Sequence, residues 1–317
     1  MKVIDHINRS KRTQLSIEVL PPLKGQTIDS IYATMDALME FEPAFVDVTY
    51  HREEYVFREV QNGLLEKMVV RKRPGTVGIC AALKYKYGID PVPHLICGGF
   101  SKEETENALI DLNFLGIENV LVLRGDPIKS EGRFKPESDG HDHAVDLLDQ
   151  VVDMNNAIYL DPDLKSQTPT DFCSGVAGYP EKHFESPSMK TDLKYLKMKV
   201  ERGAEYIVTQ LFYNNQVYFD FVKACRQEGI MVPIIPGLKP ISTKAQLNII
   251  PHFFHVNLPD VLVEQIEMAK NDIEVREIGI DWCKQQCREL IKAEVPVLHF
   301  YTMGHAKSTY EIAKAVF

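Results

Sequence analysis

Residues 101–126 read Ser-Lys-Glu-Glu-Thr-Glu-Asn-Ala-Leu-Ile-Asp-Leu-Asn-Phe-Leu-Gly-Ile-Glu-Asn-Val-Leu-Val-Leu-Arg-Gly-Asp and contain the repeating unit that decides the fold. Ser101, with Glu104 three residues later, is a typical helix start, and Gly116 is a typical helix end. The following run, residues 119–123, is short and apolar with β-branched residues, which is typical of a buried strand. A helix that leads directly into a buried strand predicts one crossover unit of a parallel sheet.

The same alternation runs along the whole chain. Strands are expected at residues 15–20, 44–50, 93–97, 119–123, 174–178, 206–212, 232–236 and 297–301. Helices are expected at 27–41, 76–87, 101–115, 144–154, 189–202, 216–227, 243–250, 307–316 and over a longer region at 258–293. Eight strand–helix repeats favour an α/β fold of the (β/α)8 TIM barrel type with inserted loops. A doubly wound sheet is the alternative, but Pro21-Pro22 follows the first strand where its dinucleotide-binding form requires a glycine-rich turn.

Two segments interrupt the alternation. Residues 51–74 form a charged, irregular stretch, and residues 156–170 form a second long loop. Loops longer than about 12–15 residues are usually functional or mobile. No change in composition marks a domain boundary, so residues 1–317 are expected to form a single domain.

Composition narrows the class of protein. Lys and Arg number 36 against 45 Asp and Glu, which gives a net charge of −9, while 44% of residues are hydrophobic and 26% are charged. These values are typical of soluble globular proteins, and the acidic balance disfavours nucleic acid or an anionic membrane as a partner. No secretory signal or apolar run of membrane-spanning length is visible, and the six cysteines form no CxxC pair. A cytoplasmic protein with reduced cysteines is expected, its partner a small-molecule substrate, and a homo-oligomer is compatible with the sequence.

Polar residues gather where the expected strands end, and in a barrel the carboxyl ends of the strands carry the chemistry. These residues are Glu18, Thr49, Tyr50, His94, Arg124, Gly125, Asp126, Tyr179, His183, Gln210 and Tyr301. Each has a structural interpretation as well: Glu18 could face solvent, His94 could be a hydrogen-bonded core residue, and Tyr301 could be part of the core. If Glu18 faces inward, burial raises its pKa and suits it to general acid catalysis. The shared location favours function over packing.

The helix expected at 189–202 carries a second signal. Asp192 and Lys199 are seven residues apart and therefore lie on nearly the same face, where they could hold a ribose hydroxyl and a pyrophosphate. A solvated charged face is the alternative. No set of residues has the spacing of metal ligands, and neither a Gly-X-Ser-X-Gly nor a phosphate-binding Walker motif is present, so serine or zinc hydrolysis is disfavoured.

Nine short motifs in chain order resemble those of the methylenetetrahydrofolate reductase family in its bacterial catalytic-domain form. They include Ser16-Ile17-Glu18, Phe45 to Tyr50, Pro93-His94-Leu95, Leu123 to Asp126, Val176 to Pro180, Asp192-Leu193-Lys194, Thr209 to Phe212, Ile235-Pro236-Gly237 and His299 to Thr302. The resemblance implies a barrel that binds FAD non-covalently. It also implies an enzyme of one-carbon metabolism that uses NADH or NADPH to reduce 5,10-methylenetetrahydrofolate to 5-methyltetrahydrofolate through the flavin.

The resemblance also implies roles for individual residues. Glu18 matches the catalytic acid, and Asp126 matches an aspartate beside the flavin. The positions that match FAD contacts are Thr49, Tyr50, His94, Arg124, Gly125, Asp126, Ala144, Tyr179, His183, Asp192 and Lys199. Those that match the substrate side are Gln210, Gln246, Tyr301 and His305, where histidine replaces an arginine of the family pattern.

Two other functions stay open at this point. One is a flavin- or folate-binding subunit that depends on an electron-transfer partner, and the other is a folate-dependent barrel methyltransferase. The second usually needs zinc, for which the sequence offers no ligand cluster.

Overall fold

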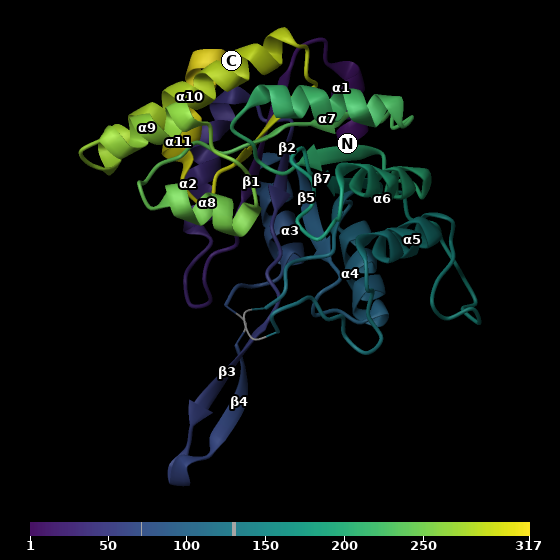
Figure 1. Cartoon of the computed structure of the whole chain (residues 1–317). Helices are drawn as coiled ribbons and strands as arrows, with labels where there is room; N and C mark the ends of the chain where they lie inside the picture. Colours follow the sequence, from purple (N-terminus) through teal and green to yellow (C-terminus); the bar gives the residue numbers. More distant parts are fainter. Residues whose placement is uncertain (71, 129–130) are drawn as a thin grey trace.

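The structure is a computed structural model that describes residues 1–70, 72–128 and 131–317. A parallel sheet surrounded by helices forms its body, and a two-stranded hairpin projects from one end (Figure 1). The strands of the sheet are β1 (Gln14–Val19), β2 (Phe45–Val48), β5 (Asp90–Ile96), β6 (Asn119–Leu123), β7 (Cys173–Gly178), β8 (Tyr206–Thr209), β9 (Ile234–Ile235), β10 (Gly237–Leu238) and β11 (Val297–Tyr301).

The sheet closes into a barrel through one divided strand. The strand order is β10-β11-β1-β2-β5-β6-β7-β8-β9, and every pairing in it is parallel. Its two outer members, β9 and β10, are consecutive in the chain and separated only by Pro236. Proline cannot donate to a strand ladder, so it divides what is topologically one strand. The predicted (β/α)8 barrel is therefore confirmed, and the doubly wound sheet is not found.

Helices cover the outside of the barrel. They are α2 (Asp29–Leu38), α3 (Thr76–Tyr87), α4 (Lys102–Phe114), α5 (Ala144–Asn155), α6 (Met189–Glu201), α7 (Asn215–Gln227), α8 (Gln246–Phe254), α9 (Asp260–Met268), α10 (Asp272–Lys292) and α11 (Ala306–Val316), with short 3-10 turns at Met39–Phe41 and Gln61–Gly63. The capping box predicted at Ser101 and Glu104 is present, with the Glu104 amide donating to the Ser101 hydroxyl at 3.2 Å. The long helical region expected at 258–293 is two helices, because the chain turns at Ala269 and a new helix is capped by Asn271.

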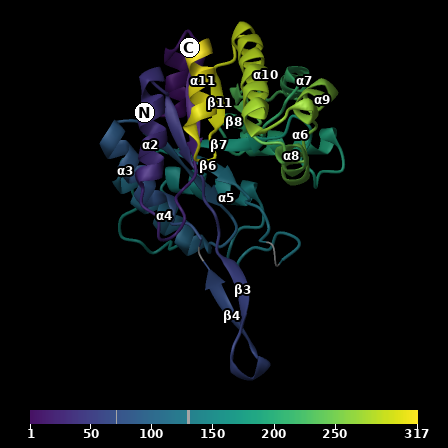
Figure 2. The ribbon, with the colours of Figure 1, turned by 90° about the vertical axis from the view of Figure 1, so that its left-hand side faces the viewer.

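The stretch 51–74 contains regular structure that the sequence analysis did not predict. Strands β3 (Glu54–Glu59) and β4 (Leu65–Val70) pair antiparallel and project away from the barrel in both views (Figures 1 and 2). The expectation of an irregular stretch was wrong, because two runs that contain β-branched or aromatic residues, such as Val56, Phe57 and Val69, lie on either side of a turn at Asn62 and Gly63. Position 71 of this stretch lies outside the described residues.

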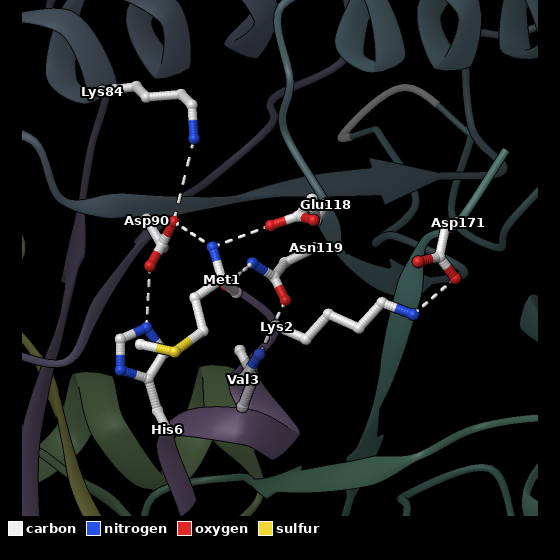
Figure 3. Close-up of polar contacts among 9 residues, drawn as sticks. All are labelled: Met1, Lys2, Val3, His6, Lys84, Asp90, Glu118, Asn119 and Asp171. Carbon is white, nitrogen blue, oxygen red and sulfur yellow. Dashed lines mark hydrogen bonds and ion pairs between the residues drawn. The ribbon is translucent and has the colours of Figure 1, made fainter. Parts of the chain in front are cut away.

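The opposite end of the barrel is covered by α1 (Val3–Arg9), a helix that the sequence analysis also missed. Val3 is fully buried against apolar residues from the strands that fill the barrel interior, including Phe45 and Leu121. Polar contacts hold this helix in place, as Figure 3 shows: Asp90 accepts a hydrogen bond from His6 at 2.8 Å and from the Met1 amino group at 2.6 Å. The hairpin end of the barrel is consequently the one left for a site.

Candidate active site at the carboxyl ends of the strands

Glu18 lies near the carboxyl end of β1 and faces the barrel interior. It is paired in register with Asp47 on β2 and with Tyr301 on β11, and its side chain is almost completely buried. The outward-facing alternative for Glu18 is therefore wrong. A carboxyl group inside a barrel is costly unless it is paired or protonated, which points to a chemical role rather than to packing.

His94 on β5 lies between two carboxyl groups. Its Nε2 atom is 3.6 Å from Glu18 Oε2 and 3.3 Å from Asp47 Oδ2. His94 is buried, and Asp47 has no exposed surface at all. The carboxyl end of the barrel thus contains an acid–imidazole–acid arrangement contributed by three adjacent strands.

Burial controls the protonation of this cluster. It raises the pKa of Glu18 to about 7, with the nearby Asp47 adding to the rise and the charges of His94 and Lys239 opposing it. Burial also raises the pKa of Asp47 to about 7 and lowers the pKa of His94. A carboxyl group with a pKa near 7 can hold a proton at neutral pH and release it to a substrate, as a general acid requires.

A second group of residues lies at the ends of β6 and β7. The Arg124 guanidinium forms an ion pair with Glu185 at 2.5 Å, and the Tyr179 and His183 rings meet edge-on with centroids 4.6 Å apart. Burial raises the pKa of Tyr179, and the negative charge of Asp126 raises it further. Arg124, Asp126, Tyr179 and His183 thus surround the same part of the rim, as expected from their positions after the strands.

Asp192 and Lys199 on α6 face this group. Lys199 Nζ donates to the carbonyl of Ala177 at 2.9 Å, and burial lowers the pKa of Lys199 to about 8 despite the opposing charge of Asp192. Asp192 accepts hydrogen bonds from the His183 amide at 3.0 Å and the Ser186 hydroxyl at 2.8 Å. The fully solvated face considered as an alternative is therefore wrong for these two residues.

Backbone and small residues complete the rim. Gly125 has φ of +83°, and a Cβ atom there would lie 3.2 Å from Cβ of Ile96. Thr49 Oγ1 lies 3.5 Å from His51 Nε2, and the Tyr50 ring packs against Phe100 with centroids 4.9 Å apart. Ala144 is the first residue of α5, where backbone N–H groups lack acceptors within the helix and can bind an anion.

The four residues predicted on the substrate side are placed differently from one another. Gln210 follows β8 and accepts a hydrogen bond from the next amide at 2.9 Å, and the Tyr301 hydroxyl donates to the Thr209 carbonyl at 2.6 Å. Gln246 accepts from two amides of the turn before α8, at 2.6 and 3.2 Å, and His305 is exposed at the start of α11. Only Gln210 and Tyr301 are thus at strand ends.

Three residues of the site were missed by the sequence analysis. Asp47 is the one charged residue of the buried strand β2. His299 lies on β11 in register with Ser16, whose hydroxyl is 2.9 Å from its Nδ1. Lys239 directly follows β10, and its charge acts on Glu18. The available signal was the same as for the other residues: a polar side chain within or just after a buried strand.

Together these observations define the class of protein: a (β/α)8 barrel with a partly buried site of ionisable residues at the carboxyl ends of its strands. A sequence profile of methylenetetrahydrofolate reductase matches residues 2–316, and the chain therefore belongs to the methylenetetrahydrofolate reductase family.

Within the described residues, no group of three His, Cys, Asp or Glu side chains is arranged to hold a metal ion, and no helix is long and apolar enough to cross a membrane.

Individual relatives support this assignment. The chain is 31% identical to methylenetetrahydrofolate reductase (NADH) 1 of Arabidopsis thaliana over 98% of its length, and 29% identical to 5,10-methylenetetrahydrofolate reductase of Salmonella typhimurium over 94%. The chain spans about half the length of the plant protein, 50%, and 88% of the length of the bacterial protein. An uncharacterized Clostridium thermocellum protein that binds two copies of 5-methyl-5,6,7,8-tetrahydrofolic acid shares the fold, with a TM-score of 0.56 and 13% identity over 99% of this chain and 98% of that one.

Proposed function

We propose that this chain reduces 5,10-methylenetetrahydrofolate to 5-methyltetrahydrofolate, with FAD as bound cofactor and NADH or NADPH as hydride donor. The single observation that carries the proposal is the buried Glu18 carboxyl group, which lies beside His94 and has a pKa of about 7. Opening the five-membered ring of this substrate requires protonation of a ring nitrogen, and an acid that is still protonated at neutral pH can supply that proton. Family membership supports the same reaction, as do the relatives named for NADH and for NADPH.

The rim fits a flavin dinucleotide. Arg124 and Lys199 supply positive charge for a pyrophosphate, and Gly125 lets a ligand approach the backbone closely. Asp192 can accept hydrogen bonds from ribose hydroxyls. The residues that would hold FAD are Thr49, Tyr50, His94, Arg124, Gly125, Ala144, Tyr179, His183, Asp192 and Lys199. When bound, FAD supplies two-electron hydride transfer between nicotinamide and folate.

The protein's own groups perform the acid and charge chemistry. Glu18 gives its proton to the substrate nitrogen, and the nearby Lys239 ammonium stabilises the carboxylate that this step leaves behind. The Asp126 carboxylate acts at the outer rim, where a cationic form of the substrate gains from a negative charge. The Tyr301–Thr209 hydrogen bond fixes the tyrosine that closes the rim next to Glu18.

The test follows the flavin spectrum under anaerobic conditions. The purified chain with added FAD should bleach with NADH or NADPH and regain its colour with methylenetetrahydrofolate. In Glu18→Gln, reoxidation by the folate should slow by about 100-fold or more, the usual contribution of a general acid, while bleaching by the nicotinamide stays within a few fold. Glu228→Gln, an exposed glutamate on a distant helix end, is the matched control.

Two results would overturn the proposal. The first is a folded chain that binds no FAD. The second is a flavin that the nicotinamides bleach but that methylenetetrahydrofolate does not reoxidise. A flavin that dithionite reduces while both nicotinamides fail would instead favour the subunit that depends on an electron-transfer partner.

A further inference from the structure

The interior of the barrel beside Glu18 contains a second carboxyl group that the proposed reaction does not use. Asp47 has no exposed surface, and its Oδ2 lies 3.3 Å from the same His94 nitrogen that Glu18 approaches at 3.6 Å. One imidazole nitrogen therefore faces two carboxyl groups, contributed by β1 and β2 at paired positions of the sheet. A nitrogen in this position can accept a proton from one carboxyl group and give it to the other.

Packing alone does not explain Asp47. A buried carboxylate destabilises the folded state unless it is well paired, and an apolar residue would fill the same space without that cost. Its second oxygen, Oδ1, is buried without a hydrogen-bond partner in the described part of the chain, as are His299 Nε2 and the Tyr206 hydroxyl. Both of these residues interact electrostatically with Asp47, so the polar cluster continues below it into the barrel.

The surroundings favour neutral histidines and protonated carboxyl groups. Burial raises the pKa of both Glu18 and Asp47 to about 7 and lowers that of His94 and His299. The titratable groups that face the two carboxyls are His94 on β5, His299 and Tyr301 on β11, Tyr206 on β8, Cys80 on α3 and Lys239 after β10. Only Lys239 among them carries a positive charge when the histidines are neutral.

We propose that Asp47 is a positioning residue that keeps Glu18 protonated and returns a proton to it through His94 Nε2. This inference rests on the proposed function, in which Glu18 is the acid. After Glu18 has given its proton to the substrate, the Asp47 proton moves to the unprotonated Nε2 of His94, and from that atom to the Glu18 carboxylate. The net change is one proton moved from Asp47 to Glu18, and solvent returns a proton to Asp47 once the product has left. No electrons are transferred in this step.

The first test uses Asp47→Asn, which keeps the shape of the side chain and removes its charge and its proton. We measure both half-reactions of the FAD-saturated protein across pH by anaerobic stopped-flow absorbance. The pH midpoint of reoxidation by methylenetetrahydrofolate should fall by about one unit, a tenfold loss of rate above that midpoint. Once Asp47 has lost its proton, its negative charge opposes ionisation of Glu18, and Asp47→Asn lacks that charge. Reduction by NADH or NADPH, whichever bleaches the wild-type flavin, should stay within twofold at every pH.

The control is Ser174→Ala, which changes another buried polar side chain of the barrel strands, on β7. It should leave both pH profiles unchanged. An Asp47→Asn profile with an unshifted midpoint, or an equal loss in both half-reactions, would overturn the inference. A wild-type flavin that methylenetetrahydrofolate does not reoxidise would instead overturn the proposed function, so the two failures are distinguishable.

The second test does not depend on turnover. Infrared difference spectra over a pH titration report the carbonyl stretch of protonated carboxyl groups. Wild type should show two buried carboxyl groups that titrate near neutral pH. Glu18→Gln should show only the Asp47 signal. Asp47→Asn should show only the Glu18 signal, at a lower pH than in wild type. If the Glu18 signal titrates at the same pH with and without Asp47, the two carboxyl groups are not coupled and the inference is wrong.

Discussion

Replacing Glu18 with glutamine should remove activity and should make the free energy of unfolding less dependent on pH. The pKa of Glu18 is raised from its ordinary 4.5 to about 7 by burial. Between these two values the folded state holds a proton that the unfolded state has lost, so this group's contribution to stability falls as the pH rises through that window and becomes constant above it. Glutamine does not titrate and escapes this loss.

The size of the effect follows from the pKa values. The protonation difference changes the free energy of unfolding by about 1.4 kcal/mol per pH unit. Between pH 5 and pH 8 the free energy of unfolding of wild type should therefore fall by about 2–3 kcal/mol relative to that of Glu18→Gln. Any fixed cost of burying the amide shifts the variant equally at both pH values and cancels from this comparison. Asp47 titrates in both proteins, but its interaction with Glu18 is absent from the variant, so the difference reports Glu18 together with that interaction.

Urea unfolding at pH 5 and pH 8, followed by circular dichroism at equal FAD saturation, measures the difference. Glu228→Gln is the control, because Glu228 is exposed at the end of α7. Its stability should follow that of wild type at both pH values. If the gap between wild type and Glu18→Gln is the same at pH 5 and pH 8, Glu18 is not a desolvated acid and the reasoning fails.

Three further predictions concern the rim and the opposite end of the barrel. Lys199→Gln removes a partly buried charge and should weaken FAD binding about tenfold, measured by flavin fluorescence titration. Gly125→Ala places a Cβ atom against Ile96 at a positive φ and should cost about 1–2 kcal/mol of unfolding free energy, measured in urea. Asp90→Asn weakens the contact with His6 and should cost about 1–3 kcal/mol at pH 6, measured by thermal unfolding.

Each of these predictions has a specific contrary result. Unchanged FAD affinity in Lys199→Gln would mean that the amine serves only the Ala177 carbonyl. If Gly125→Ala leaves the free energy of unfolding unchanged, the backbone of this turn can move to accommodate the Cβ atom. Asp90→Asn should leave FAD affinity unchanged, since it acts at the far end of the barrel, and a loss of affinity there would contradict this separation.

The repeating part of the fold could be predicted closely from the sequence. Strand β6 and helix α3 have the expected bounds, because a short apolar run and a helix-period segment each leave few alternatives. The seventh strand was expected at 232–236 and is instead two short strands on either side of Pro236. The proline inside this strand pattern indicated an interruption. The pairing of β9 with β8 and of β10 with β11, however, depends on how the barrel closes, which the local sequence does not show.

The site could be predicted in part, for a related reason. Residues that follow strands, such as Arg124 and Tyr179, were found by position alone. Asp47 was not, because a single polar residue in an apolar strand can face either way, and only the register with Glu18 shows that it faces inward. Gln246 and His305 were predicted from resemblance, and their place outside the strand ends depends on loop conformations that periodicity does not describe.

The projecting hairpin also affects how the protein behaves at high concentration. Among the described residues, β3 and β4 pair only with each other, so each has one edge that is open to another chain. Phe57, Leu64 and Leu65 are each more than 60% exposed near its tip. Charged neighbours on the same strands oppose edge-to-edge contact, namely Glu54, Arg58, Glu59, Glu66 and Lys67. Because salt screens such charges, we expect self-association to increase with ionic strength, and light scattering at low and high salt would reveal it.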